Sequence, residues 1–323
     1  MDKNNIFPGV AKYYGGLIRN DVCPIKINPL DVGVKRAGAS SHYVSERVLL
    51  CGGRSVTSSV FGDCLQYDLQ TEVWAPHSSL TRPREEAAMA MLGSQLYLMG
   101  GVGHQSVEIL DTSLEDTWFD GPELPFVLAR SCAVSTGSSI IITGGHDNSS
   151  EASLSTVLML TKETGEWSEV SRMLTPRRDH ACLYVELETS AGILVTGGLG
   201  EDDEVLGSAE FYDVNTGEWT LVSSLKVART EHVMSLVYGI PTIIGKDQKV
   251  LIKLFETILI LGGVNGDQFI SSMEQFDKSG NSWNIPLRRD WRIINHVLTS
   301  PRYEHTVASI PASKVKNIYI FIS

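Results

Sequence analysis

Three histidines stand at matching places in this sequence, and they are its most chemically capable side chains. His180, His232 and His305 each follow an arginine by three residues and open an apolar stretch. On a closed ring of repeated units these imidazoles could converge and bind a metal ion. No local cluster of further ligands accompanies them, and repetition of a residue is explained by repetition of a structure. We therefore expect the histidines to be structural.

Apart from these histidines, the sequence offers few candidates for catalysis. The sequence shows no nucleophile with a partnered base, no phosphate-binding loop and no carboxylate pair outside its repeated pattern. We expect no enzyme activity, no catalytic residue, no bound metal and no cofactor. The five cysteines, an odd number without C-x-x-C spacing, predict reduced and mostly buried strand residues. They are Cys23, Cys51, Cys64, Cys132 and Cys182.

The elements that carry these residues recur along the chain. Five apolar runs each end in a glycine pair, and the pairs are Gly52-Gly53, Gly100-Gly101, Gly144-Gly145, Gly197-Gly198 and Gly262-Gly263. A tryptophan follows each pair after 17 to 22 residues, and these are Trp74, Trp118, Trp167, Trp219 and Trp283. This regularity indicates an array of one repeated unit.

Each unit reads as four short strands. The run before the glycine pair lacks polar alternation, which is typical of a strand buried on both faces. A third strand ends on an apolar residue and an aspartate, as in Tyr67-Asp68, and a polar turn leads to a fourth strand that carries the tryptophan. Ten or twelve residues further on, an arginine precedes the next unit, and these are Arg84, Arg130, Arg177 and Arg229.

In these motifs the sequence resembles the kelch repeat family over nearly its whole length. The first four tryptophans lie 44, 49 and 52 residues apart, which is a propeller-blade period. The resemblance implies an all-β, six-bladed propeller with four antiparallel strands per blade in one domain, residues 1–323. Blades are expected at about residues 39–74, 87–118, 133–167, 180–219 and 232–283, and a last blade closed by residues 305–323 plus 12–28.

Two segments exceed the repeat. Residues 246–262 form one insertion, so two apolar runs, 241–245 and 258–261, compete for the second strand of the fifth blade. We favour 258–261, which leaves residues 239–256 as a loop. Residues 288–297 form the other insertion, because Trp283 stands 19 residues before Arg302. Either segment could be a specificity loop, and the first could instead be a splice or gene-model relic.

Blade topology predicts where a partner binds. The loop after the second strand and the loop leading into the first strand emerge on the same side of such a ring, and loops on a rigid scaffold commonly carry recognition. The predicted partner-binding face consists of Arg54, Glu85, His146, Asp147, Arg178, Asp179, Glu201, Asp202, Asp203, Glu231, Asp267 and Glu304. The acidic run from Glu201 to Glu204 is either a solvated loop or a docking surface for a basic peptide or domain.

Composition narrows the class of partner. With 27 basic and 38 acidic residues the net charge is −11, which argues against a nucleic-acid partner, and no apolar stretch predicts a membrane span. We expect a monomeric, cytoplasmic, non-catalytic protein-interaction module, which the resemblance relates to the substrate-recognition propellers of ubiquitin-ligase adaptors. In those adaptors BTB and BACK regions precede the propeller; about 35 residues precede the first blade here, so we expect neither. The alternatives are actin binding, and a kelch-fold oxidase or sugar isomerase.

Overall fold

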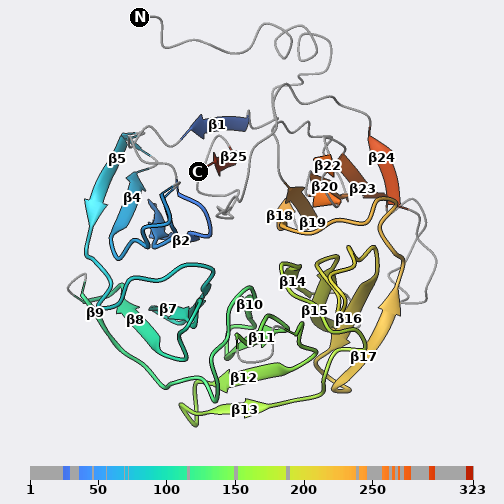
Figure 1. Ribbon diagram of the computed structural model, residues 1–323, viewed down its shortest axis with the longest axis horizontal. Helices are drawn as coiled ribbons and strands as arrows, with labels where there is room; N and C mark the ends of the chain where they lie inside the picture. Colours follow the sequence, from blue (N-terminus) through green and yellow to red (C-terminus); the bar gives the residue numbers. More distant parts are fainter. Residues whose placement is uncertain are drawn as a thin grey trace, which may run out of the picture.

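The computed structural model consists of β-sheets that stand around a central axis (Figure 1). It describes residues 25–29, 36–45, 47–55, 57–68, 70–71, 73–114, 117–148, 152–186, 190–237, 240–245, 257–261, 264–265, 268–269, 273–277, 291–294 and 318–322. Every regular element in these ranges is a strand, as the repeat predicted. Within them, no helix has the length and apolarity that a membrane crossing requires.

Four sheets, here called blades 1 to 4, share one plan of four antiparallel strands in chain order. Blade 1 contains β2 (Ser40–Val44), β3 (Arg47–Cys51), β4 (Cys64–Asp68) and β5 (Val73–His77). Blade 2 contains β6 (Ala88–Leu92), β7 (Gln95–Met99), β8 (Val107–Asp111) and β9 (Trp118–Asp120). Blade 3 contains β10 (Cys132–Ser135), β11 (Ser139–Thr143), β12 (Val157–Thr161) and β13 (Trp167–Glu169). Blade 4 contains β14 (Ala181–Glu186), β15 (Ala191–Thr196), β16 (Ala209–Asp213) and β17 (Glu218–Val222).

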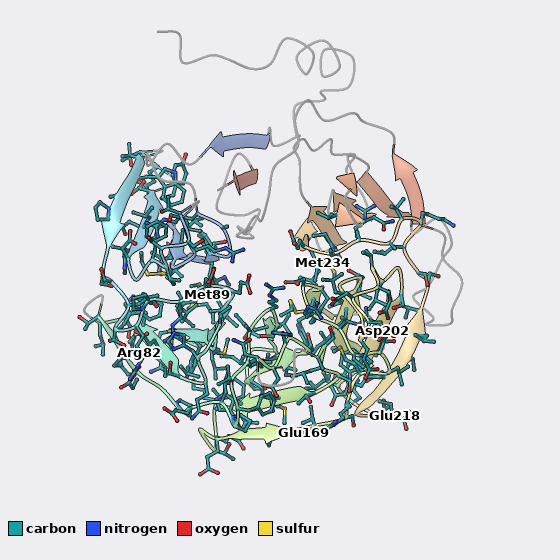
Figure 2. All side chains as sticks on the ribbon, viewed as in Figure 1. Arg82, Met89, Glu169, Asp202, Glu218 and Met234 are labelled. Atoms are coloured by element: carbon teal, nitrogen blue, oxygen red, sulfur yellow. A yellow bond between two sulfur atoms is a disulfide. The ribbon has the colours of Figure 1, made fainter. Side chains whose placement is uncertain are left out.

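The core lies between the blades. In β7, Leu96 and Leu98 belong to an apolar cluster shared with blade 1, whereas Tyr97 and Met99 belong to one shared with blade 3. Successive side chains of a strand point to opposite faces. A strand between two blades must therefore be apolar at every position, which explains the missing polar alternation in the sequence. Figure 2 shows the polar outer rim, where Glu169 and Glu218 lie, and Met89 and Met234 nearer the axis.

The glycine pairs lie where backbones meet near the axis. A Cβ on the first glycine of each pair in blades 1 to 4 would stand only 2.1 to 2.4 Å from a carbonyl oxygen of the loop that leads into the next blade. A Cβ on the second would stand 2.5 to 2.8 Å from a carbonyl of the loop that leads into its own blade. Only glycine admits both approaches. The second glycine also donates its N–H to the next loop at 2.9 Å in all four blades.

A buried ion pair fastens the leading loop to two of these blades. Arg84 pairs with Glu108 in β8 at 2.6 Å, and Arg177 pairs with Glu210 in β16 at 2.6 Å; all four side chains are at most 1 % exposed. The Arg84 guanidinium also donates to the Gly100 carbonyl at 2.9 Å. The repeated arginine therefore contacts its own blade through its side chain, and the preceding blade through its carbonyl oxygen.

Blade 3 replaces both members of this pair with leucine. The strand register aligns Leu158 with Glu108 and Glu210, because Leu160, Leu110 and Tyr212 all lie opposite the tryptophan. Leu128 stands in the place of the arginine: its carbonyl accepts the second glycine's N–H, and it shares an apolar cluster with Leu158. The sequence alignment of Arg130 with the other arginines was therefore wrong by two residues.

The fifth sheet contains an additional strand. Its order is β19 (Ile240–Gly245), β18 (His232–Val237), β20 (Thr257–Leu261), β23 (Met273–Asp277) and β24 (Trp291–Ile294). β20, which lies inside the predicted insertion 246–262, sits between β18 and β23, where a second strand belongs. The prediction of a loop over residues 239–256 is wrong for 240–245, since β19 pairs along β18. Beyond β20, β21 (Val264–Asn265) and β22 (Gln268–Phe269) form a small hairpin.

The fourth strand of this sheet corrects the position of the fifth tryptophan. Phe276 lies opposite Trp291, as Tyr67 lies opposite Trp74 and Tyr212 opposite Trp219. Trp291, and not Trp283, therefore holds the repeated position. Trp291 precedes Arg302 by 11 residues, one more than the ten that separate each earlier tryptophan from Arg84, Leu128, Arg177 or Arg229. The excess consequently falls before β24 and not at residues 288–297.

A strand near the beginning of the sequence pairs with a strand near its end. β1 (Ile25–Pro29) pairs with β25 (Ile318–Ile322) between the fifth sheet and blade 1 (Figure 1). The pairing is parallel, whereas the predicted closing blade was antiparallel throughout. Most of residues 12–28 and 305–323 lie outside the described residues, so a sixth blade and its closure stay predictions.

Four of the cysteines form disulfides, so the prediction of reduced thiols is wrong for them. Cys51 and Cys64 lie directly opposite each other in β3 and β4 and join with a Cα–Cα distance of 4.1 Å. Cys132 in β10 and Cys182 in β14 join blades 3 and 4, with a Cα–Cα distance of 5.8 Å. The sequence could not indicate these pairs because their partners are set by cross-strand and cross-blade register. Cys23 lies outside the described residues.

Substitution of Gly144 tests the close backbone approach. Gly144→Ala would place a Cβ 2.3 Å from the Arg177 carbonyl at a φ of +54°, whereas Gly137→Ala would meet no atom within 4 Å at a φ of +89°. We expect the free energy of unfolding, measured with urea, to fall by about 1–2 kcal/mol in Gly137→Ala and by at least about 3 kcal/mol in Gly144→Ala. Equal losses in the two variants would contradict the explanation.

Substitution of the buried ion pair tests its equivalence to the leucine pair. Glu210→Leu or Arg177→Leu alone leaves a buried charge without its partner, so each should cost about 3–5 kcal/mol of unfolding free energy. The double variant copies Leu128 and Leu158 of blade 3 and should cost less than either single variant. A double-mutant cycle by urea denaturation measures this, and additive losses would refute it.

Candidate binding site at the axial pocket

Five loops bring one residue each to the axis in the same left-handed conformation. These residues, here called the axial ring, are Gly38, Glu86, Arg130, Asp179 and Glu231, with φ values from +51° to +63°. The four that follow Gly38 each donate their N–H to the carbonyl of the ring residue in the preceding blade, from Glu86 to Gly38 at 2.8 Å through to Glu231 to Asp179 at 2.9 Å. Left-handed non-glycine residues persist where the surroundings over-determine them. Here the hydrogen bonds between successive ring residues hold them in this conformation.

The axial ring borders a pocket of about 190 Å³. The residue after each ring member completes the lining, and these are Ala39, Ala87, Ser131, His180 and His232. The backbone at these positions repeats from blade to blade while the side chains differ. The axial ring therefore keeps one backbone arrangement while the charges of its side chains differ from blade to blade.

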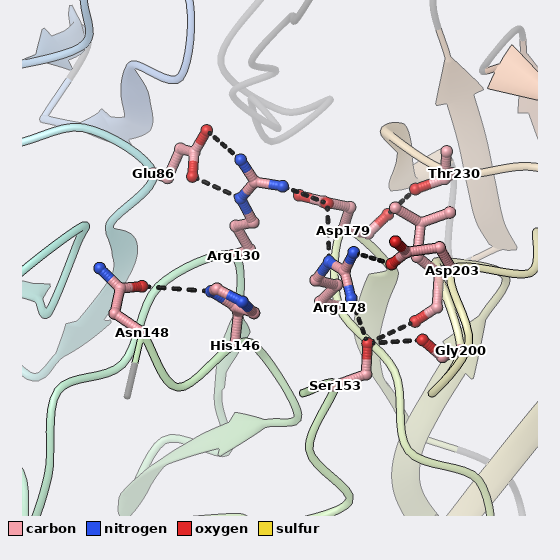
Figure 3. A network of polar contacts seen from close by, with 11 residues as sticks. Glu86, Arg130, His146, Asn148, Ser153, Arg178, Asp179, Gly200, Asp203 and Thr230 are labelled. Carbon is pink, nitrogen blue, oxygen red and sulfur yellow. Dashed lines mark hydrogen bonds and ion pairs between the residues drawn. The ribbon is translucent and has the colours of Figure 1, made fainter. Parts of the chain in front are cut away.

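Arg130 links the carboxylates of two neighbouring blades (Figure 3). Its Nε lies 2.6 Å and its Nη2 3.2 Å from the two carboxylate oxygens of Glu86. Its Nη1 lies 3.5 Å from Oδ2 of Asp179. Burial raises the pKa of Asp179 to about 7, and Glu86 and Glu231 add to the rise while Arg130 opposes it. The pocket thus combines one guanidinium with three carboxyl groups, one of which titrates near neutrality.

The two described histidines of the pocket hold neighbouring blades together. Nε2 of His180 lies 2.8 Å from the Thr143 hydroxyl of blade 3, and Nε2 of His232 lies 2.8 Å from the Thr196 hydroxyl of blade 4. Burial lowers the pKa of His180 to about 3, and it also lowers that of His232. Over the described ranges no group of three metal-ligating side chains occurs. His305 lies outside those ranges.

Short bridges join the two loop sets of the predicted partner-binding face. Arg54 pairs with Ala37, His146 with Ala129, Leu199 with Arg178 and Val264 with Thr230. In each pair, a loop after a second strand meets the loop that leads into the first strand. We call the surface that these loops form the loop face.

Side chains on the loop face differ in how free they are to contact a partner. Arg54 approaches Glu85 with a 3.4 Å Nε–Oε2 distance, and His146 lies 3.1 Å from Asn148. Glu201 and Asp202 are exposed, and Asp147 is half-buried. Asp267 and Glu304 lie outside the described residues.

Arg178 is mostly internal, although it was chosen because it breaks the repeat. It is 7 % exposed, donates to Ser153 Oγ at 2.8 Å and pairs with Asp203, whose side chain is 72 % exposed (Figure 3). Ser153 Oγ in turn lies 2.8 Å from the Gly200 carbonyl. Arg178 therefore positions the acidic turn at residues 200–204 against blade 3.

Sequence reasoning missed Glu86 and Arg130. The available signal was position: each ring residue follows the repeated arginine, or Leu128 in its place, by two residues. Because the sequence alignment matched Arg130 to the repeated arginines, it did not reveal that Arg130 belongs to the axial ring.

Titration of Asp179 gives a test of the pocket's electrostatics. Its pKa is about 7 in the folded protein and its ordinary value is 3.8, so between these pH values the folded state keeps a proton that the unfolded state releases. Ionised Asp179 thus destabilises the folded state at pH 8. This destabilisation decreases progressively as the pH falls from about 7 toward 3.8. The stability of Asp179→Asn relative to wild type should rise by about 1.4 kcal/mol per pH unit between pH 5 and 7.

Urea unfolding at pH 5, 6, 7 and 8 measures this difference. Asp111→Asn is the matched control: hydrogen bonds from Ser113 lower the pKa of Asp111, so its effect falls below this range. A stability difference for Asp179→Asn that does not change with pH would contradict the assignment.

Comparison with known proteins agrees with this architecture. The Kelch motif family model matches residues 128–174. The chain is 27 % identical over 181 residues to the Kelch repeat and BTB domain-containing protein A55 of vaccinia virus. The alignment covers 54 % of this chain and 31 % of the relative. The Kelch repeat protein M-T8 of myxoma virus is 25 % identical over 188 residues, covering 56 % of this chain and 35 % of the relative.

The chain thus spans about a third of the length of the curated relatives it matches. The motif match begins at Leu128 and ends beyond β13, so it includes all four strands of blade 3. Together with the repeated four-stranded sheets and the glycine pairs at the axis, these matches show that the chain is similar to kelch repeat proteins.

Proposed function

We propose that this chain is a non-catalytic protein-interaction module that binds a partner protein through the loop face around the axial pocket. The observation that carries the proposal is the joining of two loop sets by backbone hydrogen bonds into one fixed surface. A surface whose backbone is held before binding loses little conformational entropy on association. The kelch relatives support an interaction role.

The charge of the loop face favours a basic peptide or domain as partner. Glu201 and Asp202 project from a turn whose backbone is fixed by the bond from the Gly200 N–H to the Glu204 carbonyl at 2.9 Å. Arg178 and Ser153 hold that turn against blade 3. With a net charge of −11, the chain also attracts basic proteins at a distance.

Recognition of a substrate for a ubiquitin ligase is the more specific form of this proposal. Its support is that relatives such as A55 of vaccinia virus are named for a BTB domain beside their kelch repeats. A monomeric state and a cytoplasmic location remain predictions from the sequence.

Charge reversal on the loop face tests the proposal. Wild-type chain and the Glu201→Lys/Asp202→Lys variant would serve as bait in native lysate, with captured proteins quantified by mass spectrometry. Two exposed reversals should reduce capture of a specific partner by about tenfold. The matched control is Glu166→Lys/Glu218→Lys, which changes the net charge equally on the outer rim and should capture normally. Equal loss in both variants, or loss in neither, would contradict the proposed face.

A further inference from the structure

The disulfide between Cys132 and Cys182 crosses the seam of blades 3 and 4 beside the axial pocket. Cys132 directly follows the pocket residue Ser131, and Cys182 follows His180 by two residues. The other bonds of this seam are non-covalent. The Asp179 N–H donates to the Arg130 carbonyl at 3.0 Å, and the Arg130 and Asp179 side chains lie 3.5 Å apart.

The neighbouring seams form without a covalent bond. Strand register gives the residues equivalent to Cys132 and Cys182: Ser40 and Met89 between blades 1 and 2, Ala88 and Ala133 between blades 2 and 3, and Ala181 and Met234 between blade 4 and the fifth sheet. The blade interface therefore assembles from packing and hydrogen bonds alone. Cleavage of the Cys132–Cys182 bond should loosen the seam without unfolding the protein.

The two disulfides differ in access. Cys51 and Cys64 are 1 % and 0 % exposed and join strands within one blade. Cys132 is half-buried in the first strand of its blade, and Cys182 is 7 % exposed. Exchange begins with attack of a thiolate on a disulfide sulfur, so it requires access to one sulfur. Cys132 meets that requirement better than any other described cysteine.

We infer that the Cys132–Cys182 disulfide is a reversible staple through which the redox state of the surroundings controls the axial pocket. In the oxidised form the bond holds Arg130 and Asp179 in register, and in the reduced form the seam between them opens more often. The inference rests on the proposed function where it concerns partner binding. The regulating reagent is a low-molecular-weight thiol such as glutathione.

Reduction of the Cys132–Cys182 bond takes two successive thiol–disulfide exchanges. A glutathione thiolate attacks Sγ of Cys132, the protein S–S bond breaks, and Cys182 leaves as a thiolate that takes a proton. A second glutathione thiolate attacks the mixed disulfide, releases Cys132 as a thiol and forms glutathione disulfide. Two thiols of glutathione are oxidised, one protein disulfide is reduced, and excess glutathione disulfide reverses both steps.

The first measurement follows each cysteine and the seam during a glutathione titration of the full chain. Alkylation and peptide mass spectrometry should show Cys132 and Cys182 reduced at glutathione concentrations that leave Cys51 and Cys64 oxidised. Hydrogen exchange at the Asp179 amide should then accelerate by about tenfold while a single cooperative thermal unfolding is retained. Reduction of both disulfides together, reduction only on global unfolding, or unchanged exchange at Asp179 would overturn the inference.

The second measurement uses variants and a defined probe. Cys132→Ala/Cys182→Ala copies the Ala88 and Ala133 seam and should show fast Asp179 exchange in either redox buffer, whereas Cys51→Ala/Cys64→Ala should keep the wild-type redox response. Fluorescence anisotropy with a labelled hexa-arginine peptide should show affinity several-fold weaker after reduction. A peptide that binds neither form would refute the basic partner, while the exchange data would still decide the staple. Binding that is equal in both forms would overturn control of the pocket.

Discussion

The close approach of backbones around the axis is the constraint on which the rest of the structure depends. Each glycine pair of blades 1 to 4 lies between the carbonyls of two leading loops, at distances that exclude any side chain. The axial ring adds one N–H to carbonyl bond from each blade to the next. Because hydrogen-bonding groups that lose contact with water must find partners, this arrangement joins the blades through groups that every residue carries. Sequence can then vary at the ring and in the pocket without loss of the frame.

The same constraint allows different side chains to hold the leading loop against its blade. Arg84 with Glu108 and Arg177 with Glu210 fill the position with a buried ion pair, while Leu128 with Leu158 fill it with apolar packing. Replacing a buried ion pair by well-packed apolar residues is often close to neutral in stability. What all these blades retain is the main-chain carbonyl of the leading residue, to which the second glycine donates.

Much of the fold could be predicted because its signals are local. Glycine pairs, apolar runs and the apolar or aromatic residue opposite each tryptophan of blades 1 to 4 lie within single strands or hairpins, and they indicated the four-stranded units. Trp283 was mistaken for Trp291 because spacing alone cannot reveal an excess between third and fourth strands. The strand at residues 240–245 was missed because the repeat has no place for a fifth strand. The Cys132–Cys182 disulfide and the charge pairs of the axial ring join residues 44 to 50 positions apart, and such pairs follow from the register of whole blades.

We propose that partners bind the loop face and not the outer rim. Hydrogen exchange of the chain, alone and in complex with a partner captured from lysate, distinguishes the two surfaces. We expect slower exchange in the complex at residues 84–86, 128–131, 178–180 and 199–205, with no change in β9 and β13. Protection confined to β9, β13 or their neighbours on the outer rim would contradict it.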